Sequence, residues 1–207
     1  MAMPIAGKVG PTATNAADSA EINMRLGHTG EQIVQHLHAA YFAPMARGAM
    51  YSAANQAAQA VSVGLATTYT GLLLYNPLGS GVMLVPSKIK YALSVAPAAI
   101  ATLGIISGVQ TAAPTGPTAL VVSSTQIGNA AAGKGLVYSA ATIATPVWRL
   151  QLRDGFTAAA LPAPTMESDL DGTIGIVPGG FIAIGALTAV TGLGSIVWEE
   201  VPFNAQG

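Results

Sequence analysis

Charged residues are missing from most of the length of this chain. The stretches 48–87, 91–133 and 172–198 contain no formally charged residue. Charged residues make up only 8% of the sequence, whereas an ordinary soluble domain has about 25%. A freely diffusing monomer normally carries a charged surface that keeps it in solution. The sequence therefore predicts that other protein covers much of the surface, which is typical of an assembly subunit.

We expect no membrane-spanning segment, although the mean hydropathy is +0.52. A transmembrane helix needs about 20 consecutive, predominantly apolar residues. Turn-forming residues interrupt each charge-free stretch, at residues 76–81, at Pro97, Pro114 and Pro117, and at residues 178–180. The first ten residues also lack the long apolar core of a signal peptide.

The composition favours a β protein. The 207 residues suffice for one sizeable core, or for one domain and an arm. Aromatic residues are only 6% of the chain, while small and β-branched residues are abundant, which suits closely stacked sheets. The absence of cysteine excludes a disulfide framework and thiolate metal sites.

The net charge of −1 is divided unevenly along the chain. Residues 51–153 carry five basic and no acidic residues, and residues 154–207 carry six acidic and no basic residues. In one interpretation the two halves lie beside each other in one fold. In the other, a positive face of one copy meets a negative face of the next. The first is the simpler, and the sequence leaves both open.

Residues 1–50 are predicted to be an N-terminal arm that anchors the protein to a partner. Residues 1–28 show no period, and we expect them to become ordered against that partner. Residues 29–45 are the best helix candidate, with 29–43 as the helix body before Pro44. Thr29 can cap this helix, although the alternation of residues 34–38 also fits a strand.

Residues 51–207 are predicted to form an antiparallel, jelly-roll-like β-sandwich. Polar and apolar residues alternate over 88–95 and over 148–153, with the period of two that is typical of strands. Residues 71–85 resemble a hairpin with its turn at 76–81. Further strands are expected at 100–106, 118–124, 135–143, 173–177, 181–187 and 195–201. Many short strands separated by Gly and Pro are typical of sandwiches of this kind.

Two motifs approach known ligand sites and then depart from them. Residues 128–134 fit G-x-x-x-x-G-K, but Gly135 stands where a phosphate loop needs Ser or Thr. We expect a loop between strands there. Residues 167–172 resemble the start of a calcium loop, but the position of its bidentate Glu is occupied by Pro178. An acidic turn is the simpler interpretation.

No other residues combine into a catalytic, metal or nucleic-acid site. His36 and His38 would share a face only on a strand, and His28 is the one further histidine. Glu199 and Glu200 are adjacent, so on a strand they face opposite sides. The eight basic residues are scattered and are outnumbered by acids. We therefore expect no enzyme, no cofactor, no bound metal and no nucleic-acid partner.

Two segments of the chain resemble proteins of tailed-bacteriophage virions. They are GLLLYNPLGSGVMLVP at 71–86, and the ending from IVPGGFIAI at 176–184 to WEEVP at 198–202. Similar proteins are small jelly-roll subunits that decorate or cement capsids, or form the base of head and tail fibres. The resemblance covers roughly residues 48–203. It implies a homotrimer whose arm reaches onto a neighbouring shell protein, and it implies no catalytic residues.

The sequence thus supports two functions. The first is a capsid decoration or cement subunit of the virion, assembled in the host cytoplasm and bound through residues 1–50 to the major capsid protein or another virion protein. The alternative is a tail or head fibre, or a receptor-binding module, that recognises a host surface glycan. Glycan sites often present an aromatic platform, but Trp148 and Trp198 lie in expected strands, where we expect both to pack in the core.

Overall fold

The computed structural model describes residues 40–156 and 165–203. Within these ranges the chain forms one compact unit that begins at Ala43, and every element but one is a strand. In chain order the elements are α1 (Phe42–Ala46), β1 (Met50–Ala54), β2 (Gln59–Val61), β3 (Thr68–Tyr75), β4 (Val82–Leu93), β5 (Ala101–Val109), β6 (Thr115–Ala119), β7 (Ser123–Ser124), β8 (Leu136–Thr142), β9 (Val147–Phe156), β10 (Thr165–Asp169), β11 (Gly180–Ala186) and β12 (Val190–Pro202).

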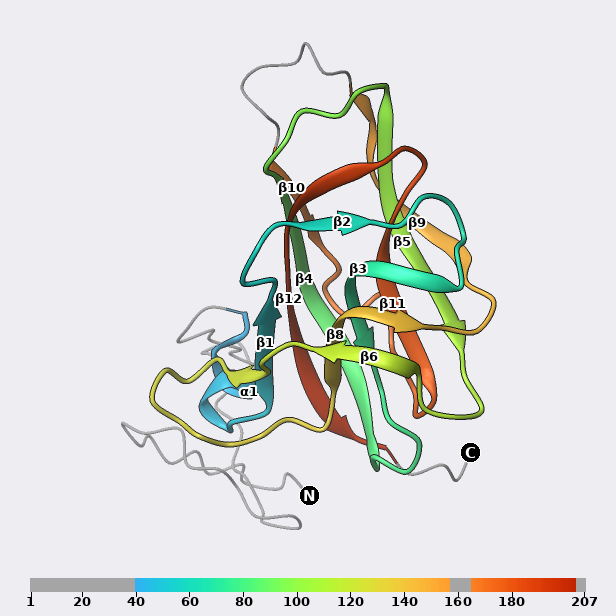
Figure 1. The fold of residues 1–207 in the computed structure, drawn as a ribbon. Helices are drawn as coiled ribbons and strands as arrows, with labels where there is room; N and C mark the ends of the chain where they lie inside the picture. Colours follow the sequence, from blue (N-terminus) through green and yellow to red (C-terminus); the bar gives the residue numbers. More distant parts are fainter. Residues whose placement is uncertain (1–39, 157–164, 204–207) are drawn as a thin grey trace, which may run out of the picture. The chain divides into compact units, whose positions relative to one another are not determined.

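The strands form two antiparallel sheets that pack as a sandwich. The first sheet has the order β10-β4-β12-β1-β7, with β2 paired to one end of β12. The second sheet has the order β6-β8-β3-β11-β5-β9. Figure 1 shows the long strands β4 and β12 side by side in the first sheet, and β3, β8 and β6 side by side in the second. The predicted all-β antiparallel sandwich is confirmed.

The strand order is that of a long hairpin wrapped into two layers. β1 pairs with β12, β3 with β11, β4 with β10 and β5 with β9, so the first half of the fold runs antiparallel to the second. The ladders β4–β12 and β5–β11 then join these pairs within each sheet. This is the connectivity of a jelly roll. β6, β7 and β8 are inserted between β5 and β9 and extend both sheets.

The main core lies between the two sheets. Ile89 and Tyr91 of β4 and Trp198 of β12 point into it from the first sheet, and Leu72 and Ile184 from the second. Each of these side chains is at most 2% exposed. Burying one large apolar side chain contributes about 1.5–3 kcal/mol. Because every second residue of a strand points to the same face, this gain decides which face of each strand turns inward.

A second cluster covers the outer face of the second sheet. Its members are the buried residues Tyr69, Leu73, Tyr75, Ile106, Tyr138, Ala141, Ile143, Phe181 and Ala183. The connector of residues 143–146 must cross this face, because β8 and β9 lie on opposite sides of β3, β11 and β5. The backbone N–H of Ile143 donates to the carbonyl of Thr67 at 2.8 Å, and Pro146 is buried. The middle strands of the second sheet are therefore buried on both faces within one chain.

The predicted hairpin over residues 71–85 is wrong, although both of its strands exist. β3 lies in the second sheet and β4 in the first, so residues 76–81 connect the two layers. The side chain of Asn76, which is completely buried, explains how a polar turn can lie at this position. Its Nδ2 donates to the carbonyls of Val82 at 2.8 Å and Ile176 at 2.7 Å.

Three other strand predictions need correction. The strand expected at 118–124 is two short strands in different sheets, β6 and β7. The segment 173–177 makes only an isolated bridge, between Ile176 and Leu84. The strand in this region is β10, which the sequence suggested as an acidic turn. β1 and β2 also occur at the start of the predicted sandwich, where no individual strand is expected.

The predicted arm and helix fall mostly outside the described residues. Of the expected helix over 29–43, the structure describes only residues 40–43, which comprise a turn at 40–41 and the first two residues of α1. Pro44 lies within α1 and does not stop it. In the first turn of a helix, proline leaves no intrahelical hydrogen bond unmade.

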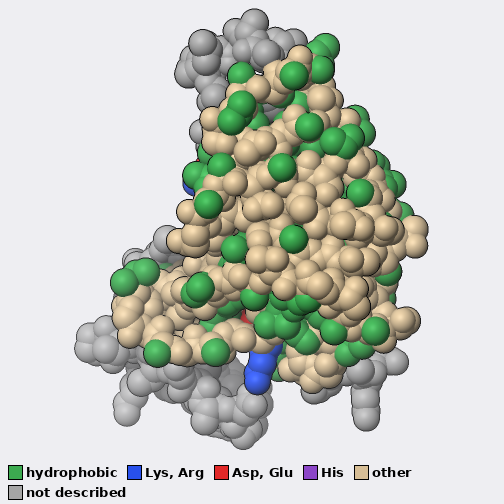
Figure 2. Space-filling view, in the orientation of Figure 1, with side chains coloured by type: hydrophobic (Ala, Val, Ile, Leu, Met, Phe, Trp, Pro, Cys, Tyr) green, Lys and Arg blue, Asp and Glu red, His purple; other side chains and the backbone are tan. Residues whose placement is uncertain are grey.

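The surface of the described unit is rich in apolar side chains. Val95, Ile100, Val109 and Val121 are between 60% and 71% exposed. Figure 2 shows a face over β3, β8 and β6 that consists of hydrophobic and neutral polar atoms, with charged atoms confined to its margins. This face therefore has the low charge that the sequence predicts.

We expect Asn76→Ala to lower the free energy of unfolding by about 2–3 kcal/mol, because it removes the donor from one buried and one partly buried carbonyl. Denaturant titration measures this change. Asn129→Ala is the matched control, since Asn129 is exposed and hydrogen-bonds only within its own loop. Its expected cost is about 0.5 kcal/mol, and equal costs for the two variants would contradict the role assigned to Asn76.

Candidate binding site at the β9 edge

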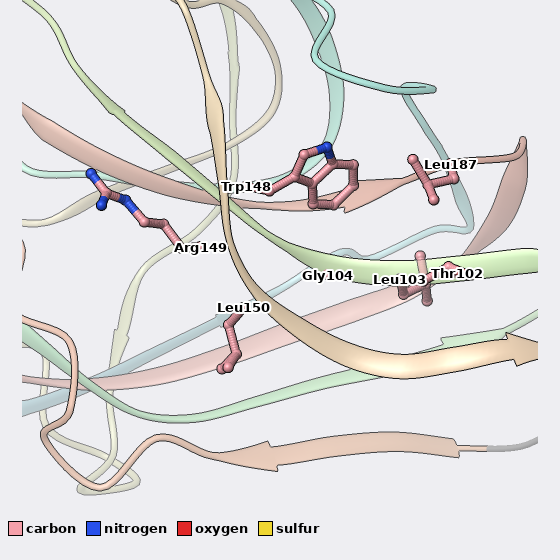
Figure 3. Close-up of a pocket in the computed structure, with 7 residues that line it drawn as sticks. All are labelled: Thr102, Leu103, Gly104, Trp148, Arg149, Leu150 and Leu187. Atoms are coloured by element: carbon pink, nitrogen blue, oxygen red, sulfur yellow. The ribbon is translucent and has the colours of Figure 1, made fainter.

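A β-bulge at Arg149 sends three consecutive side chains of β9 in different directions. Trp148 lies opposite Ile106 and Leu150 opposite Ile105, so Arg149 is the extra residue in the ladder. Ile106 belongs to the outer cluster and Ile105 to the main core. Figure 3 shows Trp148 and Leu150 on opposite sides of β9, with Arg149 pointing away from Trp148. Bulges commonly re-aim side chains at binding sites.

Trp148 forms one wall of a pocket on the outer face of the second sheet. The indole of Trp148 lies over the cross-strand pair Gly104 and Gly185, and Gly104 also lines the pocket. A Cβ atom on either glycine would lie 2.9 Å from the six-membered ring of Trp148, so only glycine lets the indole lie this close to the sheet. The pocket has a volume of ≈ 260 Å³ and is lined by Thr102, Leu103, Gly104, Trp148, Arg149, Leu150 and Leu187 (Figure 3).

Trp148 is 37% exposed, so the expectation that it packs in the core is wrong. Trp198 is completely buried, as expected. The alternation of residues 148–153 predicts that Trp148 and Leu150 share a face, but the bulge at Arg149 separates them. One signal of the pocket is present in the sequence, because Gly104 and Gly185 interrupt two strands. A single glycine does not reveal which side chain it admits.

Arg149 lies along a groove of ≈ 540 Å³ on the other side of β9. Its Nε donates to Oγ of Ser107 at 2.7 Å, which holds the guanidinium in one orientation. Segment 173–177 forms the opposite wall of the groove. Among the described side chains, no carboxylate forms an ion pair with Arg149.

The lysines of β4 are paired with acids of the same chain. Lys88 Nζ lies 2.6 Å from Glu167 Oε1 and 3.1 Å from Asp169 Oδ1, and Lys90 Nζ lies 3.0 Å from Glu167 Oε2. Hydrogen bonds from Lys88, and then from Lys90, lower the pKa of Glu167. The hydrogen bonds that Lys88 donates to Glu167 and Asp169 raise the pKa of Lys88 itself. For these strands, the interpretation that the two charged halves lie beside each other in one fold is confirmed.

The calcium-like segment 167–172 therefore has another role. Glu167 and Asp169 lie on β10, and the carboxylates of both are engaged by the ammonium group of Lys88. In the ranges that the structure describes, no three His, Cys, Asp or Glu side chains are grouped as a metal site. His28, His36 and His38 lie outside those ranges.

The phosphate-loop-like segment 128–134 holds a carboxylate of its own chain. Oε1 of Glu200 accepts hydrogen bonds from the backbone N–H groups of Lys134 at 2.7 Å and Gly135 at 2.8 Å. The indole N–H of Trp198 donates to the same oxygen at 3.3 Å. The segment lies in the connection between β7 and β8, as the expected loop between strands. Its anion-binding N–H groups are therefore already occupied.

None of the protein-family models, curated proteins or solved structures compared with the chain matches it. The described part of the chain contains no helix with the length and apolar character needed to cross a bilayer.

We expect Gly185→Ala to displace the indole of Trp148 and to increase its quenching by acrylamide. The new Cβ would lie 2.9 Å from the ring and 2.7 Å from Ile106 Cγ2, and overpacking of this kind costs about 1–3 kcal/mol. Because Trp198 is fully buried, Trp148 supplies the quenchable fluorescence. Trp148→Phe checks this assignment. Unchanged quenching in a folded Gly185→Ala protein would contradict the close approach.

Proposed function

We propose that this protein is a non-enzymatic structural subunit of a tailed-bacteriophage virion. It decorates or cements the capsid and stabilises the shell as a homotrimer. The observation that carries the proposal is a jelly-roll unit with large apolar side chains and few charges on its surface. Extended apolar surface on a soluble protein usually marks a place of association.

The energetics of the exposed side chains support association of several copies. The exposed large apolar residues include Val63, Leu65, Leu78, Val95, Ile100, Val109, Val121, Ile127, Leu136, Val177, Leu187 and Leu193. Interfaces of obligate oligomers bury about 2,000 Å² or more. At about 25 cal/mol per Å², such burial is large beside the stability of a typical domain, about 5–15 kcal/mol. A subunit that assembles soon after synthesis gains this stabilisation.

In this proposal the subunit is made in the host cytoplasm and functions in the virion. Residues 1–50 attach it to the major capsid protein or to another virion protein. The compact unit starts at Ala43 and β1 at Met50. The attachment segment and the sandwich can therefore be separated experimentally by a truncation before residue 43.

We expect the full-length protein to have a native mass near three times that of the 20.7 kDa chain, measured by light scattering after gel filtration. A variant lacking residues 1–42 should remain a trimer, with a native mass near three times that of its own shorter chain, and should keep its melting temperature, because the sandwich supplies the subunit contacts. It should lose binding to undecorated shells, measured by co-sedimentation.

Full-length protein with the same shells is the control for that loss. A monomer at micromolar concentration would contradict the trimer. Full occupancy of shells by the truncated variant would contradict the role of the arm.

A receptor-binding module that holds host glycan is the second candidate, and the half-exposed indole of Trp148 favours it. An aromatic side chain at the edge of a pocket can stack on the apolar face of a sugar ring, while polar groups at the rim set its orientation. The pocket of Trp148 is on the outer face of the sheet and opens beside an edge strand.

We expect glycans that bind the isolated protein on an array to lose binding in Trp148→Ala. Val121→Ala, which truncates an exposed apolar residue that does not line the pocket, should leave binding unchanged. Circular dichroism checks that both variants are folded. An array with no bound glycan, or binding that survives Trp148→Ala, would remove this candidate.

A further inference from the structure

We propose that the groove beside Arg149 binds the carboxylate of an acidic saccharide, such as a chain of uronic acid units. This inference rests on the second candidate function and names its ligand class. It does not depend on the trimer or on attachment to the shell. Three features carry it: the orientation of Arg149, the absence of an acid partner for it in the described chain, and the mixed lining of the groove.

The guanidinium of Arg149 is held ready for an anion. The β-bulge places it at the edge strand, and its Nε is engaged by Ser107 Oγ at 2.7 Å. The two terminal nitrogens of an arginine carry four further N–H donors, and a carboxylate accepts two parallel hydrogen bonds from such a group. Because one hydrogen bond already fixes the side chain, binding loses less side-chain entropy than it would with a free arginine.

The other cations of the described chain differ from Arg149 in their surroundings. Lys88 and Lys90 are paired with acids of β10, and Arg47 with Glu199 at 3.3 Å. Lys134 has no such ion pair in the described part, but it lines neither the pocket of Trp148 nor the groove. Among the cations whose side chains the structure describes, a set that does not include Arg153, Arg149 alone combines a concave site with an unmatched charge.

The rest of the groove fits a sugar better than a simple ion. Its walls include apolar side chains, such as Leu150 and Ile174, together with the hydroxyl groups of Ser107 and Thr173. Its volume of ≈ 540 Å³ is within the range of about 300–1,000 Å³ for small-molecule sites. A saccharide offers the matching combination of C–H faces, hydroxyl groups and one carboxylate per ring. The pocket of Trp148, across β9, can hold a neighbouring ring of the same chain.

The test is calorimetric titration of the full-length protein with trigalacturonate, neutral galactotriose and a hexaglutamate peptide. We expect trigalacturonate to bind about tenfold more tightly than galactotriose. Arg149→Gln should abolish this difference, and Ser107→Ala should reduce it while Ser107→Thr retains it. Lys134→Gln is the matched control, because it removes the same charge outside the groove, and it should leave the difference unchanged.

Each other outcome overturns the inference. If galactotriose binds and charge makes no difference, the acidic site is wrong while the glycan-binding candidate stands. If neither saccharide binds, both fail together. If Lys134→Gln weakens binding as much as Arg149→Gln, the attraction is a general effect of net charge. If hexaglutamate binds as tightly as trigalacturonate and depends equally on Arg149, the groove recognises acidic peptides.

Discussion

The pairing of β4 with β12 is the constraint on which the rest of the fold depends. The ladder runs from the pair of Val82 with Pro202 to the pair of Leu93 with Gly192. It joins the first half of the chain to its last strand. β12 also pairs with β1 and β2, and its Trp198 and Glu200 hold the loop before β8. Without this ladder the wrapped hairpin would have no first sheet, and the second sheet would lose the layer that covers its inner face.

Burial on two faces explains much of the missing charge. β3, β5 and β11 each lie in one of the three charge-free stretches, and together they form the middle of the second sheet. One face packs on the first sheet and the other under the connector of residues 143–146. A strand that is buried on both faces has no position for a lysine or glutamate. Only the remaining apolar surface therefore supports the argument for assembly.

The sequence predicts features that depend on local period, and it fails where a partner strand decides. The alternation around Lys88 and Lys90 correctly gives an amphipathic strand, because every second residue meets the same environment. In β9, the bulge at Arg149 shifts the alternation of side chains by one residue. The bulge arises from the register between β9 and β5, which the local sequence does not show. The false hairpin at 71–85 has the same origin, since a polar turn looks alike whether it joins neighbouring strands or two layers. The candidate site depends on the register of β9 with β5 and on which strands share a sheet. Neither can be predicted from the local sequence, so sequence analysis missed the site.

The position of the site constrains how copies can assemble. β9 is an edge of the second sheet, and an unpaired edge can recruit a strand from another chain. The bulge and the charge of Arg149 oppose such pairing. Bulges and charged side chains protect edge strands in other sheets in the same way. A trimer built through β9 would cover the pocket of Trp148 and the groove of Arg149 together. If saccharide binds there, the contacts between subunits must use other surfaces, and Val121 and Ile127, exposed residues of the segment inserted between β5 and β9, are available for them.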